Sequence, residues 1–216
     1  MDYIAVIDYE HLDNGVFLTS LARSLAQQEN TRGIIIHGES AYTERLIQTG
    51  MMREDAVLRA IKDLNHRLIA LFADQGVATI GLNGYQKSLV QHTGDHVEID
   101  KDQFQNFPST PHLLISNLID RQSCSKPAPL ELPEFAESLQ SALNIDDVLV
   151  FSLDESGEII PKERPGFLQK EDLTDRIISE IPAEFKEIPI SIRLTTAQKF
   201  AGYPSLEGTT YISREG

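Results

Sequence analysis

The chain has 216 residues, of which 41% are hydrophobic, enough to bury the core of one large domain or of two tightly joined lobes. Its 33 acidic and 19 basic residues give a formal charge of −14, which disfavours binding to nucleic acid and to anionic membrane surfaces. The single cysteine, Cys124, excludes an internal disulfide and a CxxC-type zinc site.

The opening residues MDYIAVIDYE carry no basic segment, and no apolar run approaches the ~20 residues that cross a bilayer. We therefore expect neither secretion nor membrane anchoring. Together with the lone cysteine, this favours a cytoplasmic location.

Hydrophobic periodicity predicts strands alternating with helices. In chain order, the expected elements are a strand at 4–7, a helix at 16–28, a strand at 34–36, helices at 41–49 and 54–74, strands at 77–82 and 113–115, a helix at 134–143, a strand at 148–153, a helix at 171–180, and strands at 190–194 and 209–212. The polar residues 86–111 fit a β-meander or an exposed excursion. The proline-rich residues 120–133 indicate a linker.

This alternation predicts an α/β three-layer sandwich, a mainly parallel sheet with helices on both faces. The linker suggests a division into an N-terminal lobe, 1–125, and a shorter C-terminal lobe, 126–216. In such sheets, ligands bind beyond the carboxyl ends of the strands. The loops that follow Ile7, Ile36, Leu82, Ile115 and Leu153 are therefore the places to seek a site.

Several of these loops are similar in order and spacing to those of acetylglutamate kinase, a branch of the amino acid kinase family. The matching segments are IIIHGES at 34–40, LNHRLI at 64–69, ATIGLNG at 78–84, VLVFSLDESG at 148–157 and EGTTYI at 207–212. The resemblance implies the fold of that family, with the N-terminal lobe on the substrate side and the C-terminal lobe on the nucleotide side. It also implies a homodimer formed through helices of the first lobe.

The same resemblance shows what is missing for phosphoryl transfer, which depends on cationic groups and backbone amides around the phosphates. Ile7 stands where the family has its first lysine, and Tyr9 and Glu10 replace glycines. Glu39 and Ser40 replace two further glycines, and the segment with the second lysine has no counterpart. We therefore assign no catalytic residue.

The resemblance also indicates candidate ligand-binding residues. On the substrate side these are His37, Gly38, Glu39, Arg53, Asn65, Gly81, Asn83 and Gly84, and on the nucleotide side Asp154 and Gly157. Each has a structural alternative. His37 is equally suited to a hydrogen bond with a neighbouring backbone group, and the glycines are equally suited to a tight passage between strand and helix. Arg53 could simply begin a solvated helix, and Asp154 and Gly157 could form an ordinary turn.

The leading hypothesis is a catalytically impaired amino acid kinase homologue that binds a small metabolite or a protein partner. The first alternative is an active small-molecule kinase acting on an N-acylated amino acid, which alone would need ATP and magnesium. The second is a structural interaction module. His92 and His96 have no third ligand nearby in the sequence, so we expect no metal site.

Overall fold

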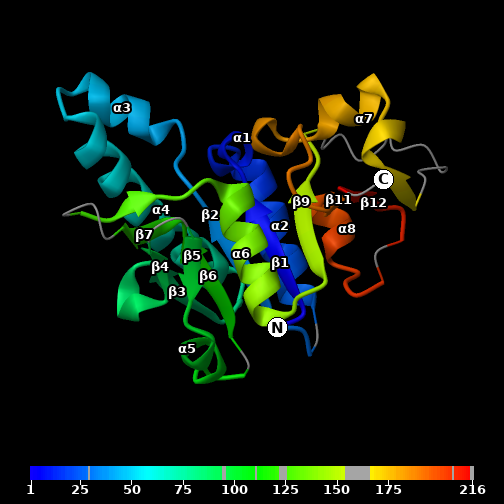
Figure 1. Cartoon of the computed structure of the whole chain (residues 1–216), viewed down its shortest axis with the longest axis horizontal. Coiled ribbons are helices and arrows are strands. Elements are labelled where there is room, and N and C mark those ends of the chain that lie inside the picture. The colour runs from blue at the N-terminus through cyan, green and yellow to red at the C-terminus, as the bar shows by residue number, and fades with distance from the viewer. Residues whose placement is uncertain are drawn as a thin grey trace.

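A computed structural model describes residues 1–28, 30–93, 96–109, 111–121, 126–153, 166–205 and 207–214. Its centre is an eight-stranded sheet with the order β10-β12-β11-β9-β1-β2-β6-β3 (Figure 1). The strands are β1 (Tyr3–Ile7), β2 (Gly33–His37), β3 (Thr79–Asn83), β6 (His112–Ser116), β9 (Asp147–Phe151), β10 (Phe167–Gln169), β11 (Ile192–Thr195) and β12 (Thr210–Ser213). All neighbouring strands pair in parallel except β11 and β12. The predicted fold class is confirmed.

The two faces of the sheet are covered by different elements. Because side chains alternate along a strand, Ile4 and Val6 of β1 face one layer while Tyr3, Ala5 and Ile7 face the other. The first layer contains α6 (Leu132–Leu143), which lies in front of the sheet in Figure 1. The second contains α2 (Gly15–Gln27), α4 (Arg53–Asp74) and α8 (Ala197–Phe200).

Helix α4 shows how the sequence produces these layers. Its buried residues Val57, Ile61, Leu64, Leu68 and Phe72 recur at helical spacing, so they form one apolar stripe. Acids in the first turn favour its start, and a glycine with a φ of +80° follows its end. With α3 (Tyr42–Gln48), the start of α4 forms the projection at the upper left of Figure 1.

The expected polar excursion contains regular structure. It includes β4 (Val90–Thr93), β5 (His96–Ile99) and α5 (Lys101–Gln105), and a smaller sheet has the order β5-β4-β7-β8. Strand β8 (Ala128–Pro129) lies in the predicted linker at 120–133, and β7 (Leu118–Arg121) runs into it, so this segment contains regular structure. Strands β7 and β8 are only four and two residues long, so they give little periodic signal.

One further difference and one feature of the sheet concern the C-terminal half. The helix expected at 171–180 is a 3₁₀ turn, η2 (Lys170–Asp172), followed by α7 (Asp175–Glu180), because Thr174 caps a new helix through its side chain. The sheet also continues across the predicted lobe boundary, since β9 pairs with β1. The remaining short elements are α1 (Tyr9–Leu12), η1 (Gln86–Ser88) and η3 (Ala183–Phe185).

Gly33 begins β2 beneath a buried aromatic ring. A Cβ atom there would lie 1.9 Å from the ring of Tyr3. We expect Gly33→Ala to lower the free energy of unfolding by about 1–3 kcal/mol, the usual effect of overpacking a core. Chemical denaturation measures this. Gly15→Ala, where a Cβ atom would meet nothing within 4 Å, is the control and should not destabilise. Equal stability of the two variants would contradict the packing described for Tyr3.

Candidate functional site

A cavity of about 340 Å³ opens at the carboxyl ends of β1 and β2. Its walls come from the loop after each strand, the turn after β6, the start of α6 and η3. The lining residues are Tyr9, Glu10, Gly38, Glu39, Asn117, Pro129, Leu130, Glu131, Leu132, Ala183 and Glu184. Tyr9, Glu10 and Glu39, which could have plugged this place, line an open cavity instead.

Asp8 sets the geometry at the end of the central strand. Its buried carboxylate accepts backbone hydrogen bonds from Glu10 and His11 and so caps α1. Its other oxygen lies 2.7 Å from Nδ1 of His11. Asp8 thereby turns the chain so that Tyr9 and Glu10 reach the cavity.

The same contacts tie β1 to β9. Nε2 of His11 lies 3.2 Å from the carbonyl oxygen of Ser152, just beyond β9. The Ser152 hydroxyl donates to Glu180 at 3.0 Å, and the amide of Leu153 donates to the carbonyl oxygen of Glu180. His11 thus contacts the backbone of Ser152 while the Ser152 hydroxyl donates to a carboxylate, which differs from the order of contacts in a nucleophile–base–acid triad. It is a buried polar connection beneath the cavity.

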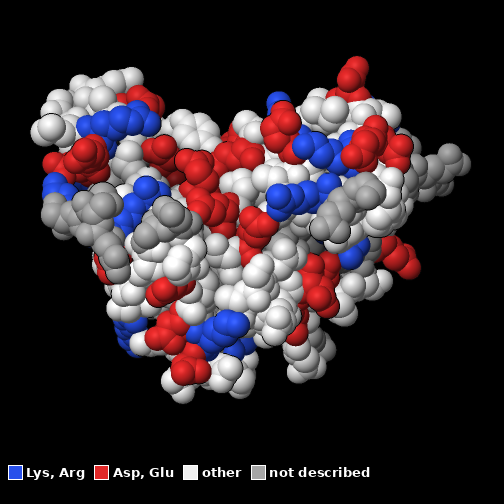
Figure 2. Space-filling model, viewed as in Figure 1, with Lys and Arg blue, Asp and Glu red and all other residues white. Residues whose placement is uncertain are grey.

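Four carboxylates line the cavity, from Glu10, Glu39, Glu131 and Glu184, and no lysine or arginine is among its described lining residues. Burial raises the pKa of Glu184 to about 7, with further contributions from the charges of Asp8, Glu131 and Glu10. Figure 2 shows acidic side chains gathered around the notch beside the α3–α4 projection, with basic ones nearer α7. The cavity is therefore strongly electronegative.

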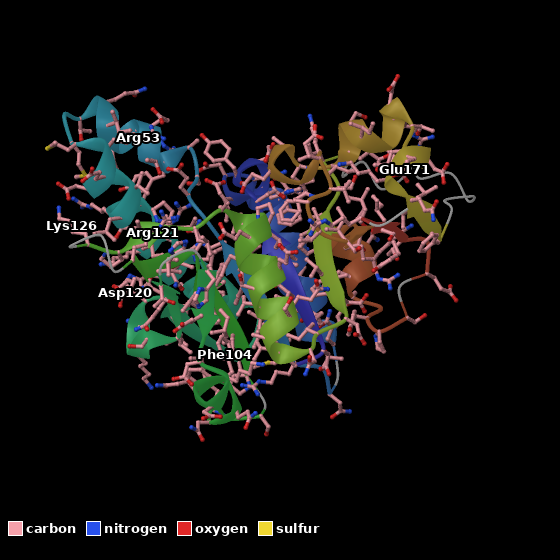
Figure 3. All side chains as sticks on the ribbon, in the orientation of Figure 1. Arg53, Phe104, Asp120, Arg121, Lys126 and Glu171 are labelled. Atoms are coloured by element: carbon pink, nitrogen blue, oxygen red, sulfur yellow. The ribbon has the colours of Figure 1, made fainter. Side chains whose placement is uncertain are left out.

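Of the candidate ligand-binding residues, Gly38 and Glu39 line the cavity. Arg53 approaches from outside: its guanidinium pairs with Glu44 at 3.0 Å and lies 3.9 Å from Glu39. Its side chain is 64% exposed and lies on the projection (Figure 3). This placement fits a solvated helix start better than a carboxylate clamp.

His37 lies at the end of β2 and is completely buried. Its Nδ1 is 3.1 Å from the carbonyl oxygen of Gly38, the structural alternative considered for it. Its Nε2 is buried and has no hydrogen-bond partner within the described part of the chain. Burial lowers the pKa of His37 to about 4, so the ring is neutral at pH 7.

The other candidates lie together at the edge of the sheet, where α4 meets β3, which β6 separates from β2. Asn65 donates to the carbonyl oxygen of Leu82 at 2.7 Å, and the side-chain oxygen of Asn83 accepts from Ser116 at 2.8 Å. Gly81 is required for packing, because a Cβ atom there would lie 2.1 Å from Ile69. The amides of Asn83, Gly84 and Tyr85 already donate within the protein, to Gln86, Ser116 and Leu118 respectively. They are not directed at an anion.

Asp154 and Gly157 lie outside the described residues. No local pattern in the sequence marks Asn117, Glu131 and Glu184 as site residues. They come from segments far apart in the chain, and only the return of η3 to the end of β1 brings Glu184 to the cavity. Among the residues that the structure describes, no group of three or more His, Cys, Asp or Glu is placed to hold a metal ion.

Comparison with solved structures defines the class of fold. An N-acetylglutamate synthase from Neisseria gonorrhoeae, complexed with coenzyme A and N-acetyl-glutamate, superposes with a TM-score of 0.63 at 15% identity over 100% of this chain and 60% of that one. An isopentenyl phosphate kinase superposes with a TM-score of 0.64 at 10% identity, covering 99% of this chain and 100% of that one. Aspartokinase III from E. coli superposes with a TM-score of 0.65 at 8% identity, covering 100% of this chain and 65% of that one.

These proteins have the fold of the amino acid kinase family, and this chain shares it. It spans less than two thirds of the N-acetylglutamate synthase and aspartokinase chains. The sequence matches no protein-family model and no curated protein. None of the described helices is long and apolar enough to cross a membrane.

The low pKa of His37 makes stability depend on pH. The neutral ring is favoured in the folded state, so this contribution is complete above pH 6.5 and is lost as the pH falls toward 4. We expect the loss to be on the order of 3 kcal/mol. Urea denaturation between pH 7 and 4 should give a flatter profile for His37→Leu than for the unmodified protein, whatever their stabilities at pH 7. Parallel profiles would contradict the burial of a neutral His37.

Proposed function

We propose that this protein is an amino acid kinase homologue that has lost phosphoryl transfer and binds a small cationic ligand in the strand-end cavity. The observation that carries the proposal is the lining of four carboxylates with no described lysine or arginine. An amine or a guanidinium compound is the ligand chemistry that such a lining favours.

Charge argues against a nucleotide here. The first turn of α6 lies at the cavity, and a helix N-terminus contributes roughly half a positive elementary charge. Glu10, Glu39 and Glu131 oppose it with three carboxylates even when Glu184 is protonated, and Arg53, 3.9 Å from Glu39, offsets only one of them. A triphosphate would meet net repulsion without the cations that kinases place around it.

Hydrogen-bonding capacity supports the same ligand class. Asn117 is only 6% exposed, and its amide nitrogen donates to the carbonyl oxygen of Leu130 at 2.6 Å. Its side-chain oxygen is buried and has no partner in the described part of the chain. This oxygen and the carboxylates are acceptors, whereas ammonium and guanidinium groups are donors only. A cationic ligand would therefore match the charge and the hydrogen-bonding capacity of the carboxylates.

The remaining expectations are proposals at this stage. A specific kinship with acetylglutamate kinase rests on the loop resemblance alone. A protein partner carrying a basic side chain would use the same chemistry as a small amine. Homodimerisation through the first-lobe helices and a cytoplasmic location also stay predictions.

Calorimetric titration tests the proposal with putrescine, a four-carbon diamine, and with ATP and magnesium. We expect putrescine to bind and its affinity to fall as salt is added, because the attraction is electrostatic. Uncharged 1,4-butanediol should not bind. Glu39→Gln and Glu131→Gln should each weaken putrescine binding roughly threefold to tenfold.

Glu171→Gln is the matched control, because Glu171 is exposed and lies away from the cavity on η2 (Figure 3). It makes the same change in net charge and should leave the affinity unaltered. Binding and turnover of ATP with magnesium would instead establish the active-kinase alternative. Absence of binding by both putrescine and ATP would favour the interaction module.

A further inference from the structure

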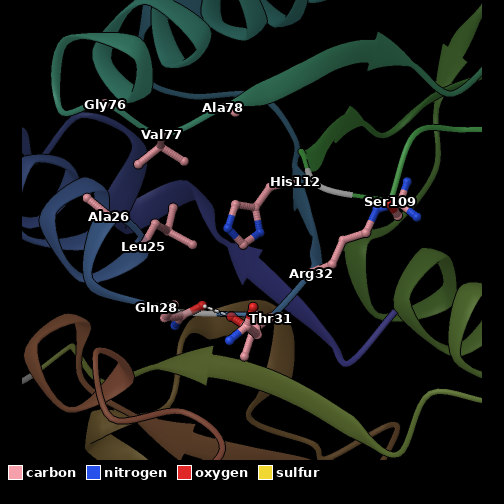
Figure 4. Close-up of a pocket in the computed structure, with 11 residues that line it drawn as sticks. Leu25, Ala26, Gln28, Thr31, Arg32, Gly76, Val77, Ala78, Ser109 and His112 are labelled. Carbon is pink, nitrogen blue, oxygen red and sulfur yellow. Dashed lines mark hydrogen bonds between the residues drawn. The ribbon is translucent and has the colours of Figure 1, made fainter.

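A second cavity, of about 420 Å³, lies at the opposite, amino-terminal edge of the sheet (Figure 4). The end of α2, the turn from α4 into β3 and the residues at the starts of β2 and β6 enclose it. Leu25, Ala26, Val77 and Ala78 form its apolar wall. Arg32 and His112 supply its ionisable groups, so its chemistry differs from that of the strand-end cavity.

His112 presents a fixed donor to this cavity. The side chain is only 6% exposed, and its Nδ1 accepts the backbone N–H of Gly33 at 3.2 Å. Nδ1 must therefore be unprotonated, which places the proton of the neutral ring on Nε2. Burial, and then the charge of Arg32, lower the pKa of His112, so the ring is neutral at pH 7. In Figure 4 the ring projects between the apolar wall and Arg32.

Arg32 presents an unused cationic donor. Its Nε donates to the carbonyl oxygen of Pro111 at 3.2 Å, which fixes the plane of the guanidinium. Its Nη2 is buried and has no hydrogen-bond partner among the residues that the structure describes. A buried, charged N–H without an acceptor is unfavourable, and an anionic oxygen is the acceptor that it favours most.

Two of the other polar side chains at this cavity, Gln28 and Thr31, are already engaged, whereas Asn30 and Ser109 are exposed. Gln28 accepts from Tyr3 and from Thr31 through its oxygen and donates to the carbonyl oxygen of Phe200 through its nitrogen. The hydroxyl of Thr31 is the donor in its contact with Gln28. Arg32 and His112 are the ionisable groups that line this cavity among the described residues, and they are the ones able to recognise a charged ligand.

We propose that this cavity binds the carboxylate of a small organic acid whose apolar body lies against Leu25 and Val77. The planar guanidinium of Arg32 matches a carboxylate, and His112 Nε2 supplies a second, neutral donor. A phosphate dianion would find a single cation and a largely apolar wall. This site does not depend on the function proposed for the strand-end cavity.

The test is titration of the complete chain with acetate, butyrate and hexanoate, followed by NMR of the His112 Nε2–H resonance and by calorimetry. Affinity should rise along the series by roughly fourfold per methylene buried, until the cavity is filled. The resonance should shift with hexanoate. Inorganic phosphate should bind more weakly than hexanoate, and uncharged butyramide more weakly than butyrate.

Two variants assign the binding to this cavity. Arg32→Gln should weaken hexanoate binding at least tenfold, whereas Arg67→Gln, an equal charge change at an exposed position on α4, should not alter it. Ala26→Phe fills the cavity from an exposed helix position without touching Arg32, and should also abolish binding. Equal binding of butyramide, tighter binding of phosphate, insensitivity to Arg32→Gln, or no carboxylate binding at tens of millimolar would each overturn the proposal.

Discussion

The pairing of Asp8 with His11 is the constraint on which the strand-end cavity depends. It places a buried carboxylate at the end of the central strand, where it caps α1 and, through His11, holds the chain beyond β9. Tyr9 and Glu10 reach the cavity because α1 begins there, and Glu10 in turn accepts the amide of Ala183, beside Glu184. Burial among these carboxylates then raises the pKa of Glu184. The Asp8–His11 contact thus fixes the part of the site wall that carries Tyr9 and Glu10.

The charges at the two ends of the sheet are arranged in opposite ways. The carboxyl ends of the strands meet four carboxylates, whereas the amino-terminal edge has an arginine with an unused donor beside a buried histidine. Helix N-termini at the carboxyl ends of parallel strands ordinarily attract anions. Here acidic side chains outweigh that effect at the strand-end cavity. The fold is thus that of the compared structures, while the described lining of the strand-end cavity is acidic.

The fold could be predicted from the sequence to the extent that its signals are local. The apolar stripe of α4 and the β-branched runs of β1 and β2 follow from residues close in the chain. Strands β7 and β8 could not, because they are short and depend on pairing with one another. The candidate site was predicted in part: the loop at Gly38 and Glu39 lines the cavity. Glu131 and Glu184 are ordinary surface-type residues in sequence, and only the tertiary arrangement brings them to Glu10. The cavity at Arg32 and His112 likewise joins residues far apart in the chain.

The strand-end cavity is expected to accept a positively charged ligand, and the pKa of the Glu184 carboxyl is the quantity that responds to the charge of a bound ligand. Its titration by carbon-13 NMR should give a pKa of about 7 in the free protein. Saturation with putrescine should lower that pKa, since a nearby cation favours the ionised carboxylate, and ATP with magnesium should leave it unchanged. A pKa that putrescine does not move, or that a bound nucleotide raises, would contradict the account.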